Sequence, residues 1–303
     1  MTERKLIDSI NELRQQRDAV ILAHNYELDE VQAIADFAGD SLELSRKAAT
    51  VDAKVVVFCG VHFMAETAAV LSPEKTVLLP ARDAGCPMAD MITGGQLRAL
   101  KAEHPDAAVI CYVNSSAEVK AESDCCCTSA NALEVAKAFA HAPEIIFVPD
   151  KNLGGHVASL LGRTFIPWEG YCHVHQLMTA DDVHKARKAH PNAPVMVHPE
   201  CAPDIRALAD HILSTGQMCR FAQADDARQY IVGTEIGILY RLETENPEKS
   251  FFPVSTKAVC EDMKKITLEN VHAALRDMKH RITVPDEIAK RAKHAITRMI
   301  ELG

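Results

Sequence analysis

The chain has 303 residues, of which 48% are hydrophobic, so it can bury a large core divided into two or three domains of ordinary size. Its formal net charge of −9 argues against a nucleic-acid-binding surface, which would need a concentrated basic face. The longest apolar runs fall far short of the roughly 18–20 residues that a membrane span requires, and the charged N-terminus does not resemble an export signal. We therefore expect a cytoplasmic globular protein that binds neither nucleic acid nor membrane.

The first part of the chain alternates between helical and extended patterns. Apolar residues at helical spacing predict an amphipathic helix at 5–16, and the apolar run at 19–27 predicts a buried strand. Further helices are expected at 29–37, 41–49 and 64–71, and further strands at 55–63 and 76–80. The strands are apolar throughout rather than alternating, which is typical of parallel sheets covered by helices on both faces.

This order of elements occurs three times. The first strand is matched by AVICYVNSS at 108–116 and PVMVHPECA at 194–202, and the second by EIIFVPDKN at 144–152 and QYIVGTEIG at 229–237. The third recurs as TFIPW at 164–168 and SFFPV at 250–254. A period of about 87 residues suits a small domain better than a solenoid unit. We predict an α/β fold of three similar αβα units about a pseudo-threefold axis with a central active site. The units span 1–87, 88–173 and 174–264, and the helices within 265–303 pack on the first unit.

Cysteine is unusually frequent, with ten residues in the chain. Three of them, Cys86, Cys172 and Cys260, follow the third strand of their units and stand 86 and 88 residues apart. One thiolate from each unit suits an iron–sulfur cluster with one iron free of protein ligands, and zinc remains an alternative. The triplet Cys125-Cys126-Cys127 looks more like a motif, but adjacent side chains diverge, so we interpret it as packing.

Polar residues follow the predicted strands, at the sheet edge where ligands of parallel sheets bind. They include His24, Tyr26, Tyr112, Asn114, His198 and Glu200. The histidines and the glutamate are candidate acid–base groups, and the tyrosines are candidate proton donors or carboxylate-binding groups. At three predicted helix starts stand Ser41, Ser129 and Thr215, which either cap the helices or help them to bind anions.

Several motifs resemble the quinolinate synthase (NadA) family along essentially the whole chain: HNYELDEVQAIADFAGDSLELSR, FCGVHFMAETA, PDKNLG, WEGYCHVH, HPEC and AVCEDMKKI. The resemblance implies an enzyme of de novo NAD biosynthesis that condenses iminoaspartate with dihydroxyacetone phosphate, forming quinolinate with loss of phosphate and water. It also implies a [4Fe–4S] cluster with one iron lacking a protein ligand, and an aspartate oxidase or aspartate dehydrogenase as the source of iminoaspartate. The chain is similar to the shorter family members, which lack an extra C-terminal CxxC-type motif.

The resemblance also implies roles for individual residues. The cluster ligands would be Cys86, Cys172 and Cys260, and the catalytic residues Tyr26, Tyr112, His198 and Glu200. Substrate binding would fall to His24, Asp40, Ser41, Tyr112, Asn114, Ser129, His198, Glu200, Ser214 and Thr215. His175 is close enough to Cys172 in the chain to be a further candidate for the cavity.

Two other functions stay open on the residues alone. One is a different iron–sulfur hydro-lyase acting on a small carboxylic acid. The other is a non-catalytic iron–sulfur sensor, which would need a DNA-binding element or a partner surface. The sequence contains no basic patch and no long apolar surface helix that would serve a sensor in this way.

Overall fold

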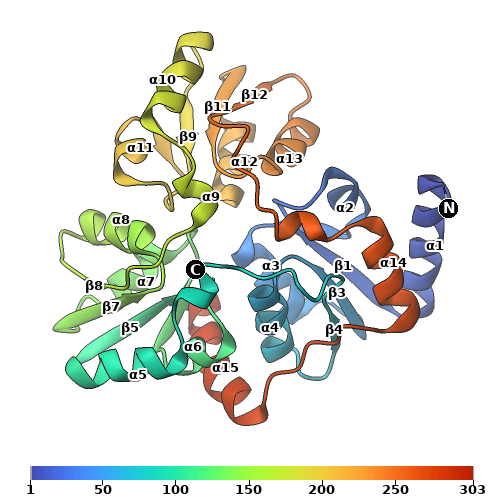
Figure 1. Cartoon of the computed structure of the whole chain (residues 1–303), viewed down its shortest axis with the longest axis horizontal. Coiled ribbons are helices and arrows are strands. Elements are labelled where there is room, and N and C mark those ends of the chain that lie inside the picture. Colours follow the sequence, from blue (N-terminus) through green and yellow to red (C-terminus); the bar gives the residue numbers. More distant parts are fainter. Residues whose placement is uncertain (1, 303) are drawn as a thin grey trace.

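The computed structural model describes residues 2–302, which form three four-stranded sheets with one shared topology. The strand orders are β2-β1-β3-β4, β6-β5-β7-β8 and β10-β9-β11-β12. Every pairing within these sheets is parallel. Figure 1 shows the three units as lobes around a common centre. The predicted fold class is therefore confirmed.

The first unit contains α1 (Glu3–Gln16), β1 (Ala19–His24), α2 (Asp29–Ile34), β2 (Phe37–Gly39), α3 (Ser41–Thr50), β3 (Val55–Cys59), α4 (His62–Leu71) and β4 (Thr76–Leu78). The second contains η1 (Ala89–Met91), α5 (Gly94–Glu103), β5 (Ala107–Tyr112), α6 (Ala117–Ala121), β6 (Cys125–Cys127), α7 (Ala132–Ala138), β7 (Glu144–Val148), α8 (Lys151–Leu161) and β8 (Ile166–Pro167).

The third unit contains α9 (His173–Gln176), α10 (Ala180–Ala189), β9 (Val195–Val197), α11 (Pro203–Ala207), β10 (His211–Ile212), α12 (Thr215–Ala224), β11 (Gln229–Gly233), α13 (Ile238–Glu245) and β12 (Ser250–Pro253). The chain continues through η2 (Met263–Lys265), α14 (Leu268–Asp277) and α15 (Asp286–Leu302). None of the described helices is long and apolar enough to cross a membrane.

The third unit shows why its strands are apolar on both sides. Val195 and Val197 of β9 pack with Ile205 of α11 in one buried cluster. Met196, which lies between them, packs with Met218 of α12 in another. Because successive side chains of a strand point to opposite faces, the two clusters lie on the two faces of the sheet. Helices therefore cover both faces, as the continuous apolar pattern predicts.

Each sheet has one edge strand that the sequence patterns did not predict. These strands, β2, β6 and β10, have only two or three residues. The predicted helix at 29–37 ends at Ile34, and the chain from Phe37 then pairs with β1. The cysteine triplet is β6 itself, and its three side chains are fully buried. The triplet thus packs in the core, as interpreted from the sequence.

The two C-terminal helices separate from each other. Helix α14 packs against α1 and β3 of the first unit. Helix α15, which we also expected there, lies mainly against α6 and β6 of the second unit and also contacts α4 of the first. Asn131 Nδ2 donates to the carbonyl of Met299, and Arg298 donates to the carbonyl of Asp124. This placement corrects the prediction for α15, which joins the first two units rather than covering one of them.

Candidate active site and its cysteine triad

A central cavity receives residues from all three units. Its lining includes all but one of the residues proposed from the sequence: His24, Tyr26, Asp40, Ser41, Cys86, Tyr112, Asn114, Ser129, Cys172, His198, Glu200, Thr215 and Cys260. The exception is Ser214, which is buried outside the lining. Residues separated by more than half of the chain therefore meet at one place, where the carboxyl ends of the three sheets converge.

The loops of Cys86, Cys172 and Cys260, here called the cysteine triad, have equivalent backbone structure. In each unit, the residue three positions after the end of β3, β7 or β11 donates its backbone N–H to the carbonyl of the residue two positions before the cysteine. These bonds join His62 to Ala84 at 2.8 Å, Lys151 to Gly170 at 2.9 Å and Ile236 to Ala258 at 3.0 Å. The sequence repeat is thus a repeat of loop geometry as well as of spacing.

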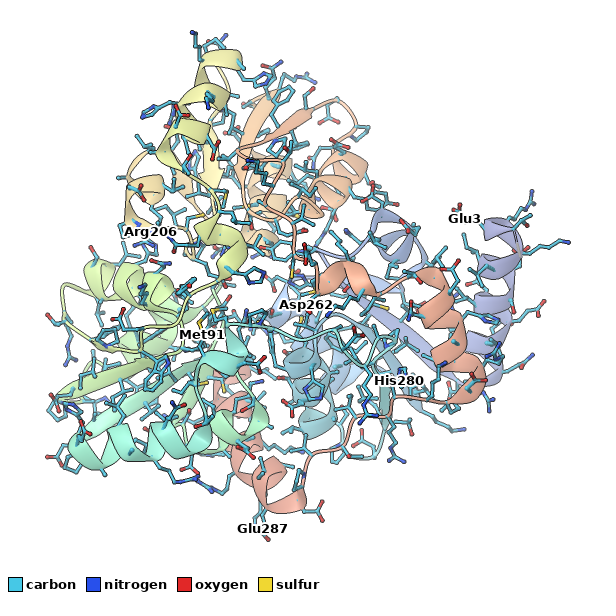
Figure 2. All side chains as sticks on the ribbon, viewed as in Figure 1. Glu3, Met91, Arg206, Asp262, His280 and Glu287 are labelled. Atoms are coloured by element: carbon cyan, nitrogen blue, oxygen red, sulfur yellow. The ribbon has the colours of Figure 1, made fainter. Side chains whose placement is uncertain are left out.

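Contacts between the units hold the triad loops together. Trp168, near Cys172, donates its indole N–H to the carbonyl of Met91, which follows Cys86. Asp262, near Cys260, accepts a hydrogen bond from the backbone N–H of Gly85. Met91 and Asp262 both lie close to the centre of the molecule in Figure 2. The loop of Cys86 is therefore tied to each of the other two.

Each triad cysteine stands just before a short helix, namely η1, α9 or η2. Burial raises the pKa of Cys86 to about 12 and that of Cys260 to about 11, while nearby backbone N–H groups oppose this rise. Burial likewise raises the pKa of Cys172. Such thiols stay protonated when free, whereas a bound metal deprotonates its cysteine ligands outright.

The triad fits an iron–sulfur cluster better than a single metal ion. All three cysteines are free of disulfides, and each comes from a different unit to the same cavity. A mononuclear site could instead use Cys172, His175 and Glu200, whose ligand atoms lie within 4.8 Å of one another. That choice would leave Cys86 and Cys260 without a role in the cavity. The donor set therefore favours three thiolates around a cluster.

Six polar side chains repeat around the cavity at two equivalent positions per unit. The first position lies at the end of β1 or β5, or directly after the end of β9, and is occupied by His24, Tyr112 and His198. The second, two residues later, is occupied by Tyr26, Asn114 and Glu200. In both sets the spacing is 88 and then 86 residues, close to the spacing of the triad. Each unit thus contributes the same two positions but different chemistry.

The two histidines of this ring are neutral hydrogen-bond donors. The Nδ1 atoms of His24 and His198 accept the backbone N–H groups of Tyr26 and Glu200, respectively. The proton of each ring is therefore left on Nε2, and His198 Nε2 lies 3.1 Å from the hydroxyl of Ser129. Burial lowers the pKa of both histidines to about 3. Neither ring contributes a positive charge at neutral pH.

A continuous chain of polar contacts, here called the proton relay, joins the two tyrosines. The hydroxyl of Tyr26 lies 2.6 Å from Thr234 Oγ1, which lies 2.8 Å from His175 Nε2. His175 Nδ1 lies 2.8 Å from Glu200 Oε2, although the direction departs from a well-aligned hydrogen bond. Tyr112 donates its hydroxyl to the other oxygen of Glu200. These contacts place the two phenols at the ends of one chain of polar groups that come from all three units.

Glu200 carries the negative charge of the relay. Burial opposes its ionisation, but the contact with His175 and the hydrogen bond from Tyr112 favour the carboxylate and lower its pKa. Burial, together with the charge of Glu200, raises the pKa of both Tyr26 and Tyr112. The carboxylate is therefore the resting acceptor and the phenols are resting donors.

The structure shows which residues cap the N-termini of α3 and α12. Asp40, not Ser41, caps α3, because its carboxylate accepts the N–H groups of Leu42 and Glu43. Ser214 likewise caps α12 by accepting the N–H of Gln217. The interpretation of Ser41 and Thr215 as capping residues is therefore wrong.

The residues that follow these two caps line the cavity. Ser41 and Thr215 are the first residues of α3 and α12, and both line the cavity. Ser129 also lines the cavity, but α7 begins only at Ala132, so the prediction that Ser129 stands at a helix start is wrong. Backbone N–H groups and the helix dipole make the starts of α3 and α12 favourable for anions. Ser214, in contrast, holds the helix start in place from behind.

Some residues of the site were not found from the sequence. Thr234 and Glu235 follow β11, and the relay passes through Thr234. Lys264 lies beyond Cys260 and contacts Glu235. The repeat could have pointed to Glu235 only through its position. It stands two residues after the end of β11, as Asp150 stands two residues after the end of β7 in the second unit.

The fold and the cavity define a class of protein in which three αβα units each bring one cysteine loop to a shared polar centre. The family model described as quinolinate synthetase A protein (NadA) matches residues 8–301. The chain is 56% identical to the quinolinate synthase of Methanoregula boonei over 297 residues, covering 98% of each chain. It is 55% identical to that of Dehalococcoides mccartyi strain 195 over 293 residues, covering 97% of each. It is 51% identical to that of Thermodesulfovibrio yellowstonii over 299 residues, covering 98% of each. The chain belongs to the quinolinate synthetase A family.

Proposed function

We propose that the chain is a quinolinate synthase, which condenses iminoaspartate with dihydroxyacetone phosphate and releases phosphate and two molecules of water. The atoms of this reaction balance without any oxidant or reductant, so the site needs acid–base and Lewis-acid chemistry rather than electron transfer. The observation that carries the proposal is the meeting, in one cavity, of three thiols with a polar ring and the starts of α3 and α12.

The triad would hold a [4Fe–4S] cluster with one iron free of protein ligands. When bound, the cluster supplies a Lewis-acidic iron that can bind substrate oxygens and assist the loss of hydroxide. The chain's own contribution is to shield this position, because apolar side chains complete the lining: Val61, Phe63, Met64, Met88, Val174 and Met263. Excluding water strengthens the electrostatic interactions in the cavity.

The helix starts would bind the anionic groups of the substrates. Ser41 and Ser129 would hold the phosphate of dihydroxyacetone phosphate, helped by the N–H groups at the start of α3. Thr215, at the start of α12, would hold a carboxylate of iminoaspartate. His24 and His198 are neutral, so they would donate hydrogen bonds from Nε2 without adding positive charge. The remaining polar lining residue, Asn114, has a buried amide oxygen without a partner and can accept one from substrate.

The proton relay would move the protons that condensation and dehydration require. Tyr112 can protonate a leaving hydroxyl while Glu200 accepts a proton from carbon, either directly or through His175. Tyr26 can act in the same way from the opposite end, with Thr234 passing the proton on. Dehydration releases hydroxide and consumes a proton, whereas carbanion formation releases one. A relay with a donor at each end serves both steps.

The deciding experiment is an anaerobic assay of protein whose cluster has been reconstituted. Iminoaspartate is generated in the assay by aspartate oxidase from aspartate, with dihydroxyacetone phosphate as the second substrate. We expect quinolinate from the native protein and none from Cys172→Ser, which loses a cluster ligand. Cys201→Ser is a matched control, because this cysteine is buried near the triad but lies outside the cavity lining. A native protein with a full cluster that forms no quinolinate would refute the proposal and favour another hydro-lyase or a sensor.

A further inference from the structure

A buried carboxylate that the proposed mechanism does not use stands behind the loop of Cys260. Glu235 is fully buried. Its Oε1 accepts the backbone N–H of Cys260 at 3.0 Å, and its Oε2 accepts that of Gly237 at 2.6 Å. The ammonium of Lys264 lies 3.1 Å from Oε1. All three neighbours are donors, which is the arrangement that suits an ionised carboxylate.

Lys264 extends this network across the boundary between the third and first units. Its ammonium donates to the backbone carbonyl of Tyr26 and to that of Glu27. Tyr26 stands at one end of the proton relay, and Cys260 is a member of the triad. The pair of Glu235 and Lys264 therefore connects a proposed cluster ligand to a proposed proton donor.

The space around this pair leaves no room for a side chain at Gly237. A Cβ placed there would lie 2.6 Å from the ammonium of Lys264, 2.8 Å from Glu235 Oε2 and 2.9 Å from the carbonyl carbon of Tyr26. On the other side, Gln32 donates its amide to the carbonyl of Gly237. The glycine thus allows three groups from two units to approach one another closely.

The second unit repeats part of this arrangement. Asp150 is also fully buried and stands two residues after β7, as Glu235 stands two residues after β11. Burial raises the pKa of Asp150 to about 8, and the backbone N–H of Cys172 is among the groups that oppose this rise. In the first unit Val61 occupies the equivalent position. A buried carboxylate therefore lies behind two of the three triad loops, and only Glu235 has a lysine partner.

We propose that Glu235 and Lys264 are positioning residues that hold the Cys260 thiol and the Tyr26 phenol in place relative to each other across the boundary of the first and third units. This inference rests on the proposed function, because it gives the triad the role of cluster ligands. In metal sites, the groups that orient ligands typically contribute 10- to 100-fold to metal affinity. The expected defect is therefore in retention of the cluster and in turnover, and not only in folding.

The test compares the loss of iron to a chelator under anaerobic conditions. We expect Glu235→Ala to lose iron about 10-fold faster than the native protein or more, because the Cys260 N–H loses its acceptor. Glu235→Gln keeps an amide oxygen for that N–H and should restore most of the retention. The matched control is Asp181→Ala, which removes a carboxylate from an exposed ion pair with Lys185 in the same unit.

A second measurement separates positioning from general stabilisation. Lys264→Met replaces no residue of the triad or the relay, and we expect it to lower kcat at equal iron content, with little change in KM, by freeing the Tyr26 loop. The unfolding temperature of the metal-free variants shows any purely structural effect. If Glu235→Ala does not fold, Glu235→Gln and Gly237→Ala carry the test, and Gly237→Ala is expected to lose iron faster than Glu235→Gln.

Two results would overturn the inference. One is iron loss from Glu235→Ala, or from Gly237→Ala in its place, at the rate of Asp181→Ala. The other is an unchanged kcat in Lys264→Met with a full cluster. The first outcome does not depend on the proposed function, because a native protein that retains its cluster but makes no quinolinate would fail the earlier assay alone. The iron-loss comparison would still be decided in that case.

Discussion

Replacing Thr234 by Val cuts the proton relay between Tyr26 and His175 without changing the shape of the side chain. Thr234 is 1% exposed, and its hydroxyl lies 2.6 Å from that of Tyr26 and 2.8 Å from His175 Nε2. In Thr234→Val the buried His175 and the partly buried Tyr26 lose this hydrogen bond, at a cost of about 1–3 kcal/mol for the buried partner. Urea denaturation of the metal-free protein should show this loss of stability.

The effect on turnover should be larger than the effect on binding. Positioned acid–base groups typically contribute 10²- to 10⁴-fold to rate, so kcat for quinolinate formation should fall by about that factor. The KM for dihydroxyacetone phosphate should change little, because Thr234 contacts the relay and not the proposed phosphate site. The assay is anaerobic quinolinate formation at matched iron content. Thr67→Val is the control, since Thr67 is equally buried and hydrogen-bonded to Lys120, outside the relay.

A double substitution tests whether the relay acts as a unit. If Tyr26 and Thr234 pass the same proton, Tyr26→Phe combined with Thr234→Val should be no slower than the worse single variant. Rate losses that multiply would mean that the two residues act independently. Full turnover in Thr234→Val would refute the relay itself, whatever the behaviour of Tyr26→Phe.

Three further predictions concern the cluster, acid stability and the C-terminal helix. Cys172→Ser should lose the visible absorbance of the cluster together with activity, and a full cluster in this variant would contradict the ligand assignment. Burial lowers the pKa of His24 and His198 from 6.5 to about 3, so below pH 6.5 the unfolded chain binds protons that the folded chain does not. The unfolding free energy of the metal-free protein should therefore decrease as the pH is lowered below 6.5, by about 1.4 kcal/mol per pH unit for each histidine. In urea titrations, His198→Asn should make this dependence of the unfolding free energy on pH less steep. An unchanged slope would count against the neutral imidazole. Ile296→Ala, at a fully buried position of α15, should cost about 2–5 kcal/mol in the same measurement while the iron content stays unchanged. A cost below 1 kcal/mol would mean that α15 is not a structural link between the first two units.

The sequence repeat is what allowed the residues that line the cavity to be predicted. Strands buried on both faces leave a continuous apolar pattern, and a parallel sheet brings the residues after its strands to one edge. The spacing of 86 and 88 residues then identified Cys86, Cys172 and Cys260 as equivalent. The structure brings these residues together, and it does the same for the polar residues at the strand ends.

Short elements and helix starts could not be read in this way. Edge strands of two or three residues carry no periodicity, and their pairing depends on the neighbouring strand already being in place. At the helix starts Asp40 precedes Ser41 and Ser214 precedes Thr215, and both members of each pair are suitable caps. Only the backbone geometry shows that the first caps and the second lines the cavity.

The sequence by itself determined three units, the cysteine triad and the polar ring, because each rests on a pattern that recurs along the chain. The tertiary structure alone decided how these parts are connected. Thr234 contacts Tyr26, from which it is separated by 208 positions in the sequence. Lys264 contacts the carbonyl of Tyr26, from which it is separated by 238 positions. Such pairs have no local signal, since each forms only where two units come into contact. The relay and the positioning pair are therefore properties of the unit boundaries, whereas the triad is a property of the repeat.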